Sequence, residues 1–118
     1  MKSYTDIEQS KSLAEILPLK SADMEYMFLK KDGSKVSNVP FVKDGFEEPE
    51  CCYIFIPCWS LAALINAMPK IQSDKAIIYL SDNDNYVSYT HLGINAQASN
   101  LVDACYEIIL KLHEQKLL

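Results

Sequence analysis

Apolar residues recur with the spacing of a helix face in three stretches of the chain. The first stretch has Thr5 as a favourable N-cap, Glu8 in the position that completes a capping box, and Pro18 as its stop signal. The last stretch begins at Asn100, and Asp103 in its first turn suits the helix dipole. The pattern therefore predicts three helices, over about residues 5–17, 60–68 and 100–115.

The middle helix has the most distinctive sequence of the three. Trp59 precedes the N-cap Ser60, Leu64 stands at the fourth helical position, and Pro69 closes the helix. Only Asn66 is polar inside this stretch. A helix that is apolar on every side must be covered on most sides, and this one is too short to cross a bilayer. We therefore expect it to be a buried core helix.

Apolar runs without helical spacing predict strands in the first half of the chain. Residues 24–30 indicate a strand, Asp32-Gly33 a hairpin turn, and residues 35–39 a weaker return strand. Residues 41–50 contain Gly, Pro and several acidic side chains, so we expect an exposed and mobile loop there.

The second half of the chain predicts further strands. A short strand over residues 53–56 is expected to end at Pro57. Residues 76–80 and 86–90 predict a second hairpin, and residues 92–96 extend its sheet. The expected fold is α+β: an antiparallel sheet of about four to five strands, in two hairpins, packed with three helices.

Composition limits the class of protein. The chain has 118 residues, which fits one domain over residues 1–118, and 49% of them are hydrophobic. A formal net charge of −5 disfavours a general affinity for nucleic acid or anionic membranes. No run of about 18 apolar residues is present, and residues 1–8 lack the apolar core of a signal peptide. We expect a soluble cytoplasmic protein with reduced thiols.

A cysteine nucleophile is the first candidate for chemistry. Cys58 lies just before a predicted helix N-terminus, where a thiolate would be stabilised, and only His91 and His113 could serve as its base. The residues around Cys58 match no cysteine-protease signature. A buried, inert thiol beside Trp59 is therefore the favoured interpretation.

Metal and nucleotide sites are disfavoured by spacing. Cys51, Cys52, Cys58, His91 and His113 supply ligand types, but they form neither a Cys-x-x-Cys nor a His-x₃₋₅-His pair. The three glycines are isolated, so neither a P-loop nor a dinucleotide fingerprint is present. We expect neither a metal nor a cofactor.

The run Asp82-Asn83-Asp84-Asn85 resembles the start of a calcium-binding loop. An EF-hand would then require an oxygen ligand and a glycine, whereas the chain continues with Tyr86 and Val87. A polar hairpin turn is the favoured interpretation.

Tyrosines accompany the predicted strands and could form a binding face, because the ring is apolar and its tip polar. Half-buried positions at the margin of the core are the more ordinary explanation. The residues concerned are Tyr26, Tyr53, Tyr79, Tyr86 and Tyr89.

Three stretches, together spanning most of the chain, carry a resemblance to a family. They are residues 21–24 (Ser-Ala-Asp-Met), residues 57–64 (Pro-Cys-Trp-Ser-Leu-Ala-Ala-Leu) with Met68-Pro69, and residues 102–105 (Val-Asp-Ala-Cys) with residues 110–114. In these the chain resembles a family of small uncharacterised proteins from gut anaerobic bacteria, their prophages and other mobile elements. The resemblance implies a bacterial, intracellular accessory protein, and it carries no catalytic residues over to this chain.

Three functional hypotheses follow from these observations. The first is a non-catalytic accessory protein that binds a protein partner, which could be a second copy of itself. The second is a small enzyme or ligand-binding domain that uses Cys58 with a histidine. The third, ranked last because lysines interrupt the acidic residues, is an acidic mimic of nucleic acid.

Overall fold

A computed structural model describes residues 2–43, 52–80 and 84–118. It has the predicted α+β composition with three helices, but its strands divide between two three-stranded antiparallel sheets, in the orders β2-β1-β3 and β4-β5-β6. The elements are α1 (Ile7–Ala14), the 3₁₀ turn η1 (Leu19–Ser21), β1 (Met24–Leu29), β2 (Phe41–Val42), β3 (Tyr53–Cys58), α2 (Leu61–Ala67), β4 (Ile77–Leu80), β5 (Asn85–Tyr89), β6 (Ile94–Ala98) and α3 (Leu101–Glu114).

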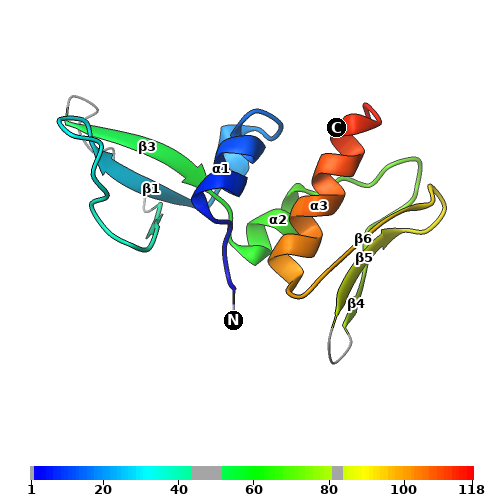
Figure 1. The fold of residues 1–118 in the computed structure, drawn as a ribbon. Coiled ribbons are helices and arrows are strands. Elements are labelled where there is room, and N and C mark those ends of the chain that lie inside the picture. Colours follow the sequence, from blue (N-terminus) through cyan, green and yellow to red (C-terminus); the bar gives the residue numbers. More distant parts are fainter. Residues whose placement is uncertain (1, 44–51, 81–83) are drawn as a thin grey trace.

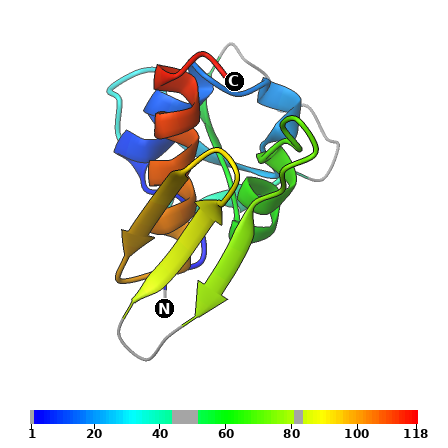
Figure 2. The same ribbon diagram turned by 90° about the vertical axis from the view of Figure 1, so that its right-hand side faces the viewer.

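The two sheets lie at opposite ends of an elongated molecule. Figure 1 shows β1 and β3 at one end, β4, β5 and β6 at the other, and the helices between them. Figure 2 looks onto the β4-β5-β6 sheet, which lies over α3. The principal extents are 48 × 30 × 23 Å and the radius of gyration is 15.4 Å. A domain of this length ordinarily has a radius of gyration of about 13.5 Å.

Helix α1 begins one residue later than predicted, because a different capping box forms. The Asp6 carboxylate accepts a hydrogen bond from the Gln9 N–H at 2.8 Å, and the Gln9 side chain accepts one from the Asp6 N–H at 3.1 Å. The prediction of Thr5 and Glu8 as the capping pair was wrong. Regular helix also ends at Ala14 rather than residue 17.

Helix α2 confirms its predicted start but not its predicted burial. Ser60 is the N-cap, and its hydroxyl accepts a hydrogen bond from the Ala63 N–H at 3.2 Å. Only Ala63 and Leu64 are buried, whereas Ile65 is 38% exposed. The expectation of cover on most sides was wrong, because α2 packs against α3 with one face and leaves the opposite face in solvent.

Helix α3 and the second sheet follow the sequence pattern closely. Asn100 caps α3 by accepting a hydrogen bond from the Asp103 N–H at 2.8 Å. The predicted second hairpin is confirmed, and the third strand lies beside it, as the register Ile78↔Val87↔Ala96 shows. The buried face of α3 consists of Val102, Ala104, Cys105, Ile108, Ile109 and Leu112.

The first sheet differs most from its prediction. The turn at Gly33 forms, with a φ of +73°, but the return strand over residues 35–39 is reduced to one bridge between Phe28 and Lys35. β1 instead pairs with β3 along its whole length and briefly with β2. Part of the predicted loop over residues 41–50 is thus strand β2, and residues 44–50 lie outside the described residues.

The hydrophobic core lies on one side of the molecule only. Its buried cluster gathers residues from α1, α2, α3, β5 and β6, together with Leu17, Ala22 and Trp59. Within the described part of the chain, no residue of β1, β2 or β3 belongs to this cluster. The first sheet is therefore attached to the core at its base rather than packed onto it.

Candidate functional site

Cys58 lies at the junction where β3 leaves the core, inside a buried polar cluster. Its thiol donates a hydrogen bond to the Thr5 carbonyl at 3.4 Å and lies 3.6 Å from the Thr5 hydroxyl. That hydroxyl also contacts the Ser10 hydroxyl at 2.8 Å and accepts a hydrogen bond from the Trp59 N–H at 3.2 Å. The Tyr26 hydroxyl donates to the same Thr5 carbonyl at 2.7 Å. The cluster binds the N-terminal segment to the base of the sheet.

The electrostatics of this cluster do not activate the thiol. Burial raises the pKa of Cys58, and hydrogen bonds from Thr5, Ser10 and Tyr26 offset that rise only in part. Burial likewise raises the pKa of Tyr26. A reactive cysteine needs a lowered pKa and solvent access, whereas the Cys58 side chain is fully buried. The geometry therefore fits a structural cysteine.

The histidines lie apart from this cluster. The backbone N–H of His91 donates to Asp74 at 3.0 Å in the turn between β5 and β6, and His113 is exposed in the last turn of α3. The Cys58 thiol forms hydrogen bonds with Thr5 and with neither histidine. The predicted pairing of Cys58 with a histidine has no support in these contacts.

The other proposed chemical sites are not assembled either. Over residues 2–43, 52–80 and 84–118, no three side chains of the metal-binding types come together. Cys52 is exposed, Cys105 is buried in α3, and Cys51 lies outside the described residues. Of the calcium-like run, residues 82 and 83 also lie outside them, and Asn85 begins β5.

Two acidic groups outside the predicted chemical sites have structural contacts. The buried Asp74 carboxylate accepts hydrogen bonds from the backbone N–H groups of His91 and Leu92, at 3.0 and 3.2 Å. Asp103 accepts hydrogen bonds from the Lys2 ammonium and the Gln9 amide, at 2.7 and 2.8 Å. These contacts hold a turn and the start of α3 in place.

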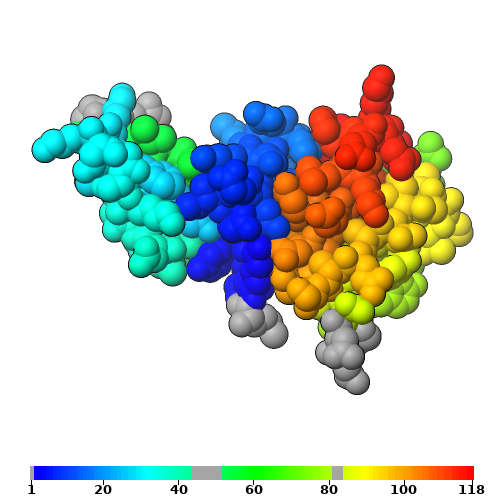
Figure 3. Space-filling view, viewed as in Figure 1, coloured from blue at the N-terminus to red at the C-terminus, as the bar shows by residue number. Residues whose placement is uncertain are grey.

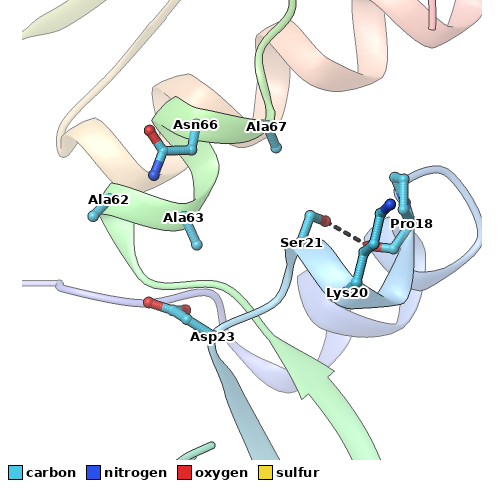
Figure 4. A pocket seen from close by; sticks show the side chains of 8 residues that line it. All are labelled: Pro18, Lys20, Ser21, Asp23, Ala62, Ala63, Asn66 and Ala67. Atoms are coloured by element: carbon cyan, nitrogen blue, oxygen red, sulfur yellow. Dashed lines mark hydrogen bonds between the residues drawn. The ribbon is translucent and has the colours of Figure 1, made fainter.

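A groove of about 460 Å³ separates η1 from α2 (Figure 4). Both oxygens of Asp23 accept hydrogen bonds from Ser60, through its backbone N–H and its hydroxyl. The Ser21 hydroxyl accepts a hydrogen bond from the Trp59 indole at 2.9 Å and donates one to the Pro18 carbonyl. These polar groups already hold η1 against α2, so the groove is a seam of the fold. Its lining is Pro18, Lys20, Ser21, Asp23, Ala62, Ala63, Asn66 and Ala67.

The tyrosines divide between the core and the surface. Tyr26 and Tyr89 are buried, and the Tyr89 hydroxyl donates to the Pro69 carbonyl at 2.6 Å. Tyr79 and Tyr86 face away from α3, with ring centroids 5.8 Å apart. Polar residues of β5 and β6 share that outer face, as expected for a sheet that packs on one side only.

Several exposed apolar side chains belong to the sheet formed by β1, β2 and β3, or to its connecting loop; we call this sheet the projecting sheet. In the space-filling view its residues make up one end of the molecule (Figure 3). Among its described strand residues, only Tyr26 and Cys58, both near its base, are buried. Large apolar side chains that are exposed on it or on its connecting loop are Val36, Val39, Phe41, Val42 and Ile54.

Both faces of the projecting sheet are apolar. Because successive residues of a strand point to opposite sides, the register of β1 and β3 assigns each side chain to a face. One face carries Tyr26, Phe28, Ile54 and Ile56, and the other carries Met27, Leu29, Tyr53 and Phe55. A sheet of this composition is ordinarily covered on both sides. The sequence predicted these strands, but nothing in its pattern indicated that they would lie outside the core.

Comparison with known proteins gives no match to a family model, to a curated protein or to a solved structure. No helix among the described residues is long and apolar enough to span a membrane.

Proposed function

We propose that the chain is a non-catalytic protein-binding module whose binding surface is the projecting sheet. The observation that carries this proposal is the contrast between composition and burial: strands of core-like composition contribute nothing to the described core cluster. Contiguous exposed apolar surface on a small domain is typical of an interaction site. A protein partner would cover it.

The position of the sheet supports this proposal. Its base is fixed by the buried hydrogen bonds around Thr5, so a partner would meet a surface that is already ordered. A pre-organised surface loses less conformational entropy on binding than a flexible one. Tyr53 and Phe55, whose ring centroids lie 6.3 Å apart, add aromatic side chains of the kind that dominate binding energy at interfaces.

The alternatives have less support. The burial of Cys58 and its raised pKa argue against a cysteine enzyme. A mimic of nucleic acid would offer a dense acidic surface, whereas lysines interrupt the acidic residues of this chain. A bacterial, cytoplasmic accessory role remains an expectation from the resemblance and the composition.

The test is affinity capture from a lysate of the native host with three forms of the tagged chain. Ile54 on the projecting sheet is 47% exposed, and Ile77 on β4 is 42% exposed, so Ile54→Lys and Ile77→Lys form a matched pair. We expect the wild type and Ile77→Lys to retain the same partner in near-stoichiometric amount, and Ile54→Lys to lose it. Equal capture by all three forms, or by none, would contradict the proposal.

A further inference from the structure

The outer edge of β3 carries backbone groups that make no bond to β1. The Lys30 N–H donates to the Cys52 carbonyl at 3.0 Å, which fixes the alternation of the β1–β3 ladder. Bonded pairs alternate with unbonded ones in an antiparallel ladder. Ile54 and Ile56 therefore bond to β1, and the N–H groups of Tyr53 and Phe55 point away from it.

Pro57 agrees with this alternation and explains why β3 does not end where the sequence predicted. Pro57 falls in an unbonded pair with Glu25, so its missing N–H costs no bond to β1. Beyond it, the N-terminal segment occupies the same edge. The Thr5 N–H bonds to the Trp59 carbonyl, and the Leu61 N–H to the Ser3 carbonyl, both at 3.0 Å. This segment does not extend along the part of the β3 edge from Tyr53 to Ile56.

We propose, as an extension of the function proposed above, that the partner is a second copy of this chain, which pairs β3 with β3 about a two-fold axis at Ile54. In that register Tyr53 and Phe55 of each copy exchange backbone hydrogen bonds with Phe55 and Tyr53 of the other. The pairing makes no use of Pro57. The two sheets join into one continuous sheet, as in other dimers formed by strand addition.

The chain exposes more surface than a compact monomer of its mass. The chain exposes 7428 Å², whereas a monomeric protein of 13.4 kDa exposes about 6,500 Å². The excess of about 900 Å² is close to the roughly 800 Å² that each partner buries in a standard interface. The radius of gyration of 15.4 Å also exceeds the value of about 13.5 Å for a compact domain of this length, so the chain is elongated.

The centre of the pairing is apolar and self-complementary. Ile54 is bonded to β1, so it faces its own copy across an unbonded pair, where opposite Cα atoms lie about 4.5 Å apart and side chains are closest. Ile54 is also the most exposed apolar side chain of β1 and β3. Contact across the axis would bury the Ile54 side chains of both copies.

Sedimentation equilibrium on the purified chain, over about 1 to 100 µM, tests this pairing. This range covers micromolar dissociation constants, the weakest that interfaces of standard size show. We expect the wild type and Ile77→Lys to dimerise equally. Ile54→Lys should weaken the dimer at least tenfold, because it places like charges opposite each other. Phe55→Pro, which removes an outward N–H, should weaken it more than Phe55→Ala, which keeps that N–H.

Each outcome decides the matter. A wild type that stays monomeric throughout overturns the second copy as the partner. A dimer that Ile54→Lys does not weaken overturns the β3 edge as the interface, and Ile54 lies in solvent, so this variant reports even if Phe55→Pro fails to fold. The function proposed above survives a monomeric result if capture of another protein is still lost in Ile54→Lys, and it fails separately if that capture is unchanged.

Discussion

The two sheets of this molecule contain strands of similar length and similarly rich in apolar residues, yet they end in opposite environments. In the β4-β5-β6 sheet, Val87, Tyr89 and Ile94 face the core beside α3 and are buried. In the projecting sheet, the corresponding stretch of β3 is half-buried or exposed, and no helix outside its base covers it. Alternation distinguishes them: in β5 and β6, polar residues on the outer face alternate with buried residues, whereas β1 and β3 are apolar on both faces.

This difference teaches that apolar composition alone does not place a strand in the core of its own chain. A strand with one apolar face needs one layer of cover, which α3 provides. A strand with two apolar faces needs two layers, and the described residues provide cover only near Thr5 and α1. Both faces of the projecting sheet therefore stay largely open in the single chain, and the β3 pairing proposed above would cover its outer edge.

The largest difference in unfolding free energy should appear when isoleucine is replaced by alanine in the core and on the projecting sheet. Ile109 is fully buried in α3 and Ile54 is 47% exposed on β3. Ile109→Ala should lower the free energy of unfolding by about 2–5 kcal/mol, because it leaves a cavity in the core. Ile54→Ala should cost less than about 1 kcal/mol in the monomer. Urea denaturation at low protein concentration measures both, and equal losses would contradict the comparison.

The joint between the two regions should show the next largest effect. Thr5→Val keeps the shape of the side chain but removes the hydroxyl that contacts Ser10 and accepts from the Trp59 N–H. Leaving these buried groups unpaired should cost about 1–3 kcal/mol of unfolding free energy. Thr90→Val, at the exposed threonine, is the matched control and should change stability little. A Thr5→Val protein as stable as the control would show that the joint is not held by this cluster.

The thiols should make stability fall in alkali. Burial raises the pKa of Cys105 to about 11 and also raises the pKa of Cys58. The native state therefore holds these protons more tightly than the unfolded state, so stability is full below about pH 9 and is lost as the pH rises above it. By pH 10 the loss from the Cys105 thiol should reach about 1–2 kcal/mol.

Denaturation at pH 8 and pH 10 measures this loss. Cys105→Ala should reduce the difference between the two values, whereas Cys52→Ala, at the exposed cysteine, should not. An unchanged difference in Cys105→Ala would mean that its thiol does not titrate with unfolding.

The smallest effect concerns the contact between the N-terminal segment and α3. Burial alone would raise the pKa of Asp103, but hydrogen bonds from Lys2, Gln9 and Asn100 outweigh it and lower the pKa. The stability that this carboxylate contributes is therefore present at neutral pH and is lost as the pH falls below about 4.

Asp103→Asn should cost less than about 1 kcal/mol at pH 7, because the ion pair with Lys2 is partly exposed. The difference in stability between the variant and the wild type should narrow as the pH falls from about 4 towards 3. Glu114→Gln, at the exposed far end of α3, serves as the control. A difference that persists undiminished at pH 3 would mean that the charge of Asp103 is not the cause.

Local signals predicted local structure well in this chain. The caps of α2 and α3 and the hairpin of β4 and β5 follow from Ser60, from Asn100 and from the apolar runs around the turn. The capping box of α1 was misplaced by one residue, because Thr5 is also a good cap but its hydroxyl is engaged with Ser10 and Trp59. That contact joins residues far apart in the sequence.

Long-range pairing was beyond the sequence pattern. The turn at Gly33 predicted that β1 would pair with the residues directly after the turn. Instead β1 pairs along its whole length with β3, which comes after β2 in the sequence. The projecting sheet was missed for the same reason: periodicity shows that a strand is apolar on both faces, but it does not say which surfaces cover it. For Cys58, the favoured interpretation of an inert thiol beside Trp59 agrees with its burial.

Amide hydrogen exchange along β3, measured at low and high protein concentration, tests the central claim most directly. The Ile54 and Ile56 amides should be protected at both concentrations, because they bond to β1. The Tyr53 and Phe55 amides should exchange freely in the dilute protein and become protected as the second copy pairs with this edge. Rapid exchange of Tyr53 and Phe55 at every concentration, or protection already complete in the monomer, would contradict the account.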